Sequence, residues 1–399
     1  MAMRRVDSVD VLRALALIGM VICHYPIFLS SGEGRDAMAH FFANHLLGGD
    51  FAASWFVFLV GLSQVLSAKK RGPTQSKTAG RVIIRGMVIF VIGLLFLLVI
   101  QGYEELWDWD ILAFIGATTI ILLICRSAPS WLLLLSCCAV CLITPWFRSL
   151  VDLTPFYGGG FESVKWVSDF IPNFIFDPVK DYGGGKAALD NVLGFFLIGQ
   201  FPLLPWIIFP LIGFVVGRKI AEDHFTSDSP LIIIIGIILS FMGLFTAYAG
   251  SIRSGPSVVN DYITPLSFYP SSFSMVIFLT GIVLILFTIL WYIYDTDPDN
   301  TKEPGMFLTY CRQISKYSLT IICHSFCPVL YPFADHQGGN RNILFKRFSE
   351  YPDCFCAGRA FADHLLPFIE TLGKAGGKYS FEWLLAKLLS IHRKGYLKC

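Results

Sequence analysis

Long apolar runs of about twenty residues alternate with short polar connections along most of the chain. A helix of that length crosses the hydrocarbon core of a bilayer, because each residue adds about 1.5 Å. The pattern therefore predicts an all-α, polytopic membrane helix bundle with about nine to ten transmembrane helices. The predicted spans cover residues 11–29, 51–68, 82–100, 109–125, 131–147, 192–217, 231–250, 270–293 and 314–333.

Two regions depart from this pattern. Residues 148–191 are too long for a plain turn and contain the sequence YGGG twice, so we expect an extracytoplasmic cap there. Residues 334–399 are more polar, and their apolar stretches are interrupted by glycines. We therefore divide the chain into a transmembrane helical domain over 1–333 and a divergent C-terminal region over 334–399, which could hold a degraded last span.

The composition agrees with a membrane protein. Of the 399 residues, 55% are hydrophobic and 15% are charged, and the mean hydropathy of +0.62 is far too high for a soluble domain. The formal net charge of +2 gives no reason to expect a nucleic-acid partner. A multi-pass protein, with the cell membrane as its location, is expected.

The positions of lysine and arginine predict the orientation. Basic residues precede the first span and fill the second, fourth and sixth connections, whereas the first, third and fifth connections are acidic. Basic short loops remain in the cytoplasm, so we predict a cytoplasmic N-terminus. The basic residues are Arg4, Arg5, Lys69, Lys70, Arg71, Lys77, Arg81, Arg126, Arg218 and Lys219.

The first two spans carry the candidate chemistry. Asp7, Asp10 and Arg13 open the first span at its cytoplasmic end. At the far end lie His24, the loop residues His40 and His45, and Asp50, which leads into the second span. A lone histidine near a helix end is more often a packing residue, but ionisable groups at membrane depth are costly and persist where they have a use. A carboxylate beside an imidazole is the arrangement that a general base needs.

Two further groups of residues could bind a ligand, but neither can be assigned to one from the sequence. The basic cytoplasmic residues suit orientation and contact with anionic headgroups, or else a dock for a phosphorylated donor. A second group has residue types that suit zinc, but its spacings match no standard site, so we expect no metal. That group contains Cys323, His324, Cys327, His336, Cys354 and Cys356.

Several stretches resemble the heparan-α-glucosaminide N-acetyltransferase family and its prokaryotic relatives. The most specific are RRVDSVDVLRALALIGMVICHY at 4–25 and FPLLPWIIFPLIGFVVGR at 201–218. Others are DFAASWFVFLVGLS at 50–63, WDILAFIG at 109–116, SKYSLTI at 315–321 and GKYSFEWLL at 377–385. Family members are multi-span enzymes that move an acetyl group from cytosolic acetyl-CoA to an acceptor across the membrane.

The resemblance implies roles for individual residues. His40 stands where the family has its catalytic histidine. It would act as a general base or carry the acyl group itself, assisted by Asp50 or His24. Eukaryotic members have an asparagine just after the first span, where this chain has His24. His24 or Asn44 would donate to a tetrahedral intermediate. The residues assigned to acetyl-CoA binding are Arg13, Lys69, Arg71, Arg81 and Arg85.

The function expected is transfer of acetyl from acetyl-CoA to an amino sugar or glycan acceptor on the extracytoplasmic side. O-acylation of a surface polysaccharide, an ion-coupled transporter and a non-catalytic scaffold stay open as alternatives. The expected partners are acetyl-CoA, a carbohydrate or amino-sugar acceptor, the lipid bilayer and, as an open alternative, a second copy of the chain in a homodimer.

Overall fold

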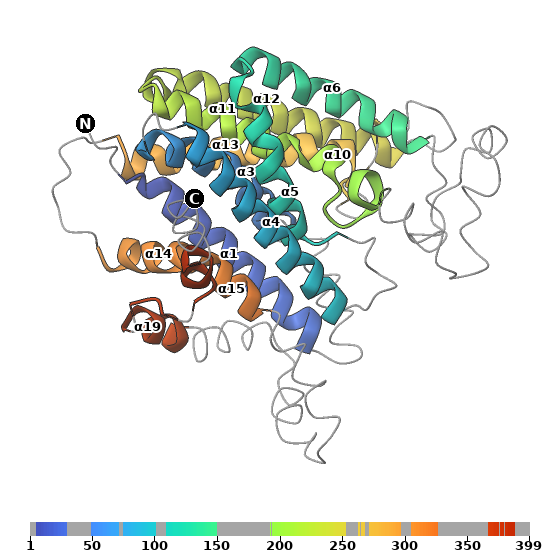
Figure 1. Cartoon of the computed structure of the whole chain (residues 1–399). Helices are drawn as coiled ribbons and strands as arrows, with labels where there is room; N and C mark the ends of the chain where they lie inside the picture. Colours follow the sequence, from blue (N-terminus) through green and yellow to red (C-terminus); the bar gives the residue numbers. More distant parts are fainter. Residues whose placement is uncertain are drawn as a thin grey trace, which may run out of the picture. The chain divides into compact units, whose positions relative to one another are not determined.

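The computed structural model of the chain is helical (Figure 1). It describes residues 5–29, 49–71, 75–100, 109–149, 192, 194–252, 262–263, 265–267, 271–296, 305–325, 366–374, 376–378 and 380–387. These residues form helices and turns but no strand, which confirms the all-α prediction.

The helices follow the apolar runs. They are α1 (Asp7–Leu29), α3 (Gly49–Arg71), α4 (Gln75–Ile100), α5 (Ile111–Ile124), α6 (Ser130–Ser149), α10 (Leu203–Trp206), α11 (Ile208–Ala221), α12 (Phe225–Ile252), α13 (Phe273–Tyr294), α14 (Met306–Lys316), α15 (Ser318–Ser325) and α19 (Leu366–Lys374). Two short helices of other pitch are η2 (Cys125–Ser127) and η3 (Gly194–Ile198). In the described part, 6 helices are long and apolar enough to span a membrane, so the chain is a multi-pass membrane protein.

Two predicted spans are interrupted. Over 192–217 the structure has η3, α10 and α11 instead of one helix, because Leu204, directly before Pro205, has the non-helical angles φ −104° and ψ 116°. Over 314–333 the helix breaks at Tyr317, where α14 ends and α15 begins. Residues 326–333 lie outside the described residues.

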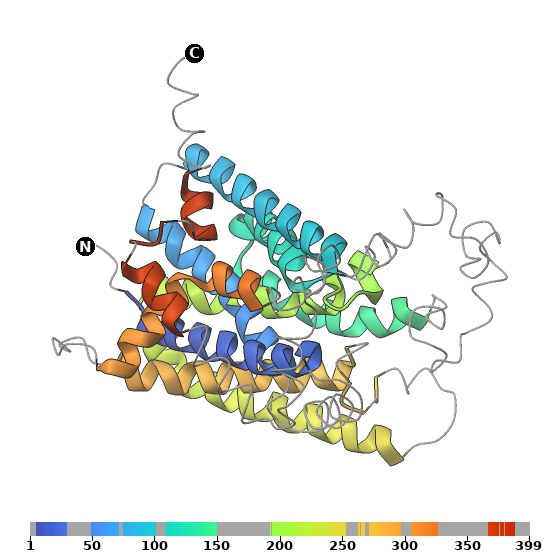
Figure 2. The same ribbon diagram turned by 90° about the horizontal axis from the view of Figure 1, so that it is seen from below.

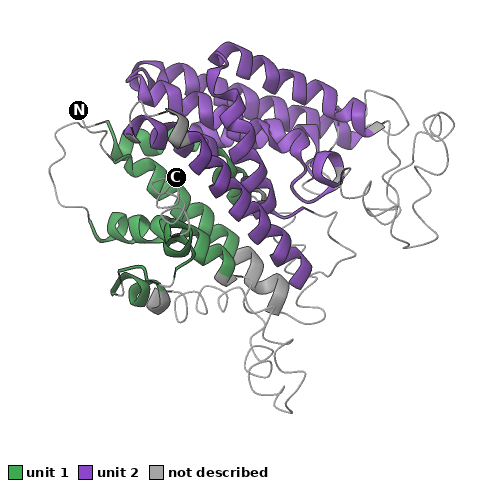
Figure 3. Cartoon of the chain, viewed as in Figure 1, with its two compact units in different colours: residues 1–59, 286–399 green, residues 60–285 purple. Residues whose placement is uncertain are grey.

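The described chain forms two compact units (Figure 3). Unit 1 contains residues 1–59 and 286–399, and unit 2 contains residues 60–285. The chain passes from one unit to the other within α3 and again within α13. Most of the predicted cap at 148–191 lies outside the described residues, which end there with Ser149.

In unit 2, glycines allow α4 and α5 to pack backbone against backbone. A Cβ atom at Gly93 would lie 2.4 Å from the backbone nitrogen of Ala113, and one at Gly116 would lie 2.5 Å from that of Phe90. Real side chains do not approach so closely, so only glycine fits these positions. Small residues at a helix interface are the usual means of close association between membrane helices.

A second small-residue contact joins α12 to α13, which run side by side in Figure 2. Gly236, Ser240 and Gly243 line the buried face of α12, and a Cβ at Gly243 would lie 2.6 Å from the nitrogen of Phe278. The opposite face of α12 is apolar and exposed, with Phe241 and Phe245 at 69% and 71%. This face is suited to lipid.

Polar contacts at the two ends of unit 2 show which helix ends lie together. At one end, Lys69 of α3 donates to the carbonyl of Ala221 at the end of α11. At the other, Arg148 of α6 donates to the carbonyl of Ser271 before α13, at 2.5 Å. Lys69 at the end of α3 and Ala221 at the end of α11 therefore lie at the same end of unit 2.

In unit 1, the C-terminal region packs against α15. Glu382 accepts hydrogen bonds from the backbone amides of Leu319 and Thr320, at 2.6 and 3.1 Å, and from the hydroxyl of Thr320. The carboxylate thus satisfies free amides at the start of α15. It stabilises the break at Tyr317 that the apolar pattern does not predict.

Residues 366–387 form two short helical segments in the described structure. The chain turns between them at Gly376 and Gly377, whose φ angles are +64° and +77°. A Cβ at Gly377 would lie 3.1 Å from the ring of Tyr317. The turn thus sets the C-terminal helix against the break between α14 and α15.

Candidate active site

The histidine-rich end of the first two spans is described in part. α1 and α3 approach closely, since a Cβ at Gly19 would lie 3.3 Å from the Cβ of Ala52. His24 lies five residues beyond Gly19, and Asp50 two residues before Ala52. Because consecutive spans run in opposite directions, His24 and Asp50 belong to the same end of this helix pair. The structure describes only the backbone at both positions, and His40, Asn44 and His45 lie outside the described residues.

The other end of α1 is held by a charged cluster, which we call the α1 cluster. Arg312 of α14 donates from Nε and one terminal nitrogen to both carboxylate oxygens of Asp7, each at 2.8 Å. The Asp7 side chain is only 7% exposed, so the pair is largely shielded from water. Bidentate pairs of this kind are among the stronger polar contacts in proteins.

Asp10 and Arg13 belong to the same cluster through Ser315. The Ser315 hydroxyl donates to Asp10 at 2.5 Å and accepts from Arg13 at 2.7 Å. Arg5 donates to the other carboxylate oxygen of Asp10. Arg13, which we assigned to acetyl-CoA binding, thus has a fixed position about one turn after Asp10, and its side chain is 20% exposed.

Asp295, directly after α13, completes the α1 cluster. Its carboxylate accepts from the backbone amides of Asp7 and Ser8, at 2.9 and 2.8 Å, as a helix-capping residue does. The start of α1 and the end of α13 therefore share one end of the bundle.

The charges in the α1 cluster depend on one another. Burial raises the pKa of Asp295, against the lowering effect of the hydrogen bonds from Ser8 and Asp7. The hydrogen bond that Arg312 donates to the Asp7 carboxylate raises the pKa of Arg312. Burial, followed by the nearby charge of Asp10, raises the pKa of Cys311 to about 11, so this thiol stays neutral and unreactive at pH 7.

The remaining basic candidates lie in unit 2 or beside its boundary. Lys69 is bound to the end of α11 through Ala221. Arg81 and Arg85 are four residues apart on α4 and so share one helix face, where Arg81 is half-buried and Arg85 exposed. The side chain of Arg71 lies outside the described residues. The structure thus places Arg13 in unit 1 and Lys69, Arg81 and Arg85 in unit 2.

The cysteine and histidine group near the C-terminal end is described only at its start. Cys323 is buried in α15 and only the backbone is described at His324, whereas Cys327, His336, Cys354 and Cys356 lie outside the described residues. No group of three or more potential metal ligands comes together among the residues that the structure describes.

Sequence reasoning missed the partners of the α1 cluster. Asp7, Asp10 and Arg13 stand out at the start of an apolar run, but Arg312 and Ser315 follow by about three hundred residues. Nothing local to Arg312 marks it as a partner of Asp7. Asp295 carries a weak signal, because a carboxylate just after an apolar run must find a polar partner at the membrane surface.

The fold defines a multi-pass, all-α membrane protein with a polar cluster at one end of its first helix. Residues 5–176 match the family model described as heparan-alpha-glucosaminide N-acetyltransferase, catalytic. The match confirms the resemblance over this part of the chain and implies an N-acetyltransferase-type enzyme. No curated protein matches the chain.

The matched segment includes every residue that we assigned to the site. It holds the histidine-rich end, with His24, His40 and Asp50, and the basic residues from Arg13 to Arg85. The similar stretches at 201–218, 315–321 and 377–385 fall outside it.

Proposed function

We propose that the protein transfers an acetyl group from acetyl-CoA to an amino sugar or glycan acceptor on the opposite side of the membrane. The observation that carries this proposal is the match of residues 5–176 to the catalytic part of the N-acetyltransferase family. The donor would enter from the cytoplasmic side, where α1 begins and α3 ends, and the acceptor from the side of His24 and Asp50.

The arrangement of charges supports this separation of donor and acceptor. In α1, Arg13 lies in the first half and His24 in the second, and in α3 Asp50 lies at the start and Arg71 at the end. Arginine suits the phosphates of acetyl-CoA, because its planar guanidinium donates several hydrogen bonds. The thioester would then reach along the helices toward the histidines.

His40 is the proposed base or nucleophile. As a base, it takes the proton of the acceptor amine or hydroxyl while the acceptor attacks the thioester carbon, and the departing CoA thiolate is then protonated. As a nucleophile, it first carries the acetyl group itself. In either route Asp50 or His24 orients the imidazole, and His24 or Asn44 donates to the tetrahedral intermediate.

The test measures thermal stabilisation by acetyl-CoA and release of CoA in detergent, over a panel of amino sugars and glycan hydroxyl acceptors. We expect acetyl-CoA to stabilise wild type and His40→Ala alike, but only wild type to release CoA. His224→Ala, at an exposed histidine between α11 and α12, is the matched control and should retain activity.

Each other outcome has a defined meaning. Turnover with hydroxyl acceptors alone would assign O-acylation of a polysaccharide. A folded sample that does not bind acetyl-CoA would exclude acetyl transfer, and substrate flux in that sample would favour the ion-coupled transporter.

A further inference from the structure

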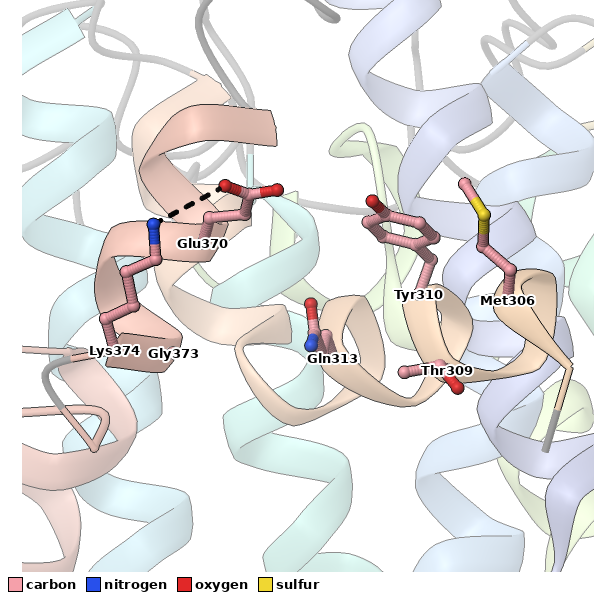
Figure 4. Close-up of a pocket in the computed structure, with 7 residues that line it drawn as sticks. All are labelled: Met306, Thr309, Tyr310, Gln313, Glu370, Gly373 and Lys374. Atoms are coloured by element: carbon pink, nitrogen blue, oxygen red, sulfur yellow. Dashed lines mark ion pairs between the residues drawn. The ribbon is translucent and has the colours of Figure 1, made fainter. Parts of the chain in front are cut away.

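An open pocket of about 570 Å³ lies between α14 and α19 in unit 1 (Figure 4). This volume is in the range of small-molecule sites. One wall is α14 and the other is α19, and the lining residues are Met306, Thr309, Tyr310, Gln313, Glu370, Gly373 and Lys374. Neither the sequence motifs nor the proposed acetyl transfer uses any of these residues.

The α19 wall offers one negative and one positive charge. Glu370 and Lys374 form an i,i+4 pair at 3.9 Å, with side chains 53% and 81% exposed. Exposed helical pairs of this kind contribute little to stability. A ligand that carries both charges can therefore replace the internal pair with two contacts of its own.

The α14 wall offers neutral hydrogen-bonding groups and an apolar edge. Figure 4 shows Tyr310 and Gln313 on the wall opposite the charged pair, with Met306 at the far end. Met306 is 77% exposed, and the adjacent Phe307 is 56% exposed. Exposed apolar side chains beside a polar pocket suit a ligand with a polar head and hydrocarbon chains.

The position of α14 places this pocket near the bilayer surface. Arg312 and Ser315 bind Asp7 and Asp10 in the first turn of α1, where the apolar run begins. The pocket residue Gln313 lies between these two anchors in the sequence. A headgroup at the membrane surface where α1 begins is therefore within reach of the pocket.

We propose that the pocket binds the headgroup of phosphatidylethanolamine, a phospholipid with a primary ammonium and a phosphate. The ammonium donates to Glu370, and the phosphate accepts from Lys374. The hydroxyl of Tyr310 and the amide of Gln313 donate to phosphate or ester oxygens, and the acyl chains follow Met306 and Phe307. This site does not depend on the acetyl transfer proposed above.

Native mass spectrometry of the detergent-purified full chain tests the site with three lipids that share their acyl chains. Phosphatidylcholine has the same charges but no N–H donor, and phosphatidylglycerol has the phosphate without the ammonium. We expect phosphatidylethanolamine to bind at least about tenfold more tightly than either, because a charge-assisted hydrogen bond to Glu370 is available to it alone. Glycerophosphoethanolamine, the soluble headgroup, should compete weakly.

Two variants and a control locate the site. Glu370→Gln should abolish the preference over phosphatidylglycerol, and Lys374→Gln should weaken binding of phosphatidylethanolamine about tenfold. Both positions are exposed, so the melting temperature should not change. Glu222→Gln, at an exposed glutamate after α11, should bind as wild type does. Equal binding of the three lipids, an unchanged Glu370→Gln variant, or strong competition by the soluble headgroup would each overturn the proposal.

Discussion

Arg312 and Asp7, 305 residues apart in the chain, form a two-bond pair in which both hydrogen bonds are 2.8 Å. The pair joins α14 to the first turn of α1, next to the carboxylate of Asp295 that caps this helix. Any movement of α14 would leave the nearly buried carboxylate of Asp7 without its cation. The pair therefore connects the C-terminal part of unit 1 to the helix that carries Arg13 and His24.

Arg312→Ala should lower the free energy of unfolding by about 2 kcal/mol or more, because it leaves the buried carboxylate of Asp7 unpaired. Arg312→Lys keeps the charge but not the two parallel bonds, so its loss should be intermediate. Thermal unfolding in detergent measures both. Arg126→Ala, at an exposed arginine, is the control. Equal stability of Arg312→Ala and this control would show that the pair contributes nothing.

Glu382→Ala should release the segment 380–387 from α15, because three hydrogen bonds end on this carboxylate. We expect a loss of about 1–2 kcal/mol, as for removal of a helix cap. Faster cleavage of the C-terminal region in limited proteolysis should accompany it. Glu382→Gln keeps one acceptor oxygen, so its stability and its cleavage rate should lie between those of Glu382→Ala and wild type. Wild-type cleavage rates in Glu382→Ala would contradict this role.

Gly93→Ala and Gly116→Ala should each prevent α4 and α5 from packing, since the added methyl group would meet backbone atoms at 2.4–2.5 Å. The cost should exceed the 1–3 kcal/mol typical of overpacking, because a backbone cannot move aside as a side chain can. Gly80→Ala, also in α4, has nothing within 4 Å of the new methyl group and is the matched control. Yield of monodisperse protein and melting temperature report the difference. Similar behaviour of all three variants would refute the packing argument.

The contact between Lys69 and Ala221 predicts from which side of the membrane introduced cysteines can be labelled. Cysteines introduced at Lys70 and Glu222 should share the cytoplasmic side, and one at Leu266 should face the other. In intact cells a membrane-impermeant maleimide should label only Leu266→Cys above the wild-type background, and in permeabilised cells it should label all three. Labelling of Lys70→Cys and Glu222→Cys from opposite sides would contradict the contact between Lys69 and Ala221.

Much of the bundle could be predicted because its strongest signals are local. The apolar runs predicted α3, α4, α6, α12 and α13 within a few residues at most ends. The break in the span at 192–217 could have been predicted from Pro205, because a residue before proline is disfavoured in a helix. Hydropathy alone does not show this break. Of the candidate site, the family match covers the segment with His24 and Asp50, but the pairing of their side chains stays a prediction.

The sequence by itself determined which segments are helical and apolar enough to enter the membrane, because burial of nonpolar side chains in lipid depends on each run alone. Only the tertiary structure decided the break at Tyr317, the pairing of Arg312 with Asp7 and the capping of α15 by Glu382. Each of these joins groups that are distant in sequence. Hydrogen bonds and ion pairs need atoms within about 3 Å, so they depend on how the helices pack. They produce no periodic pattern in the sequence from which they could be predicted.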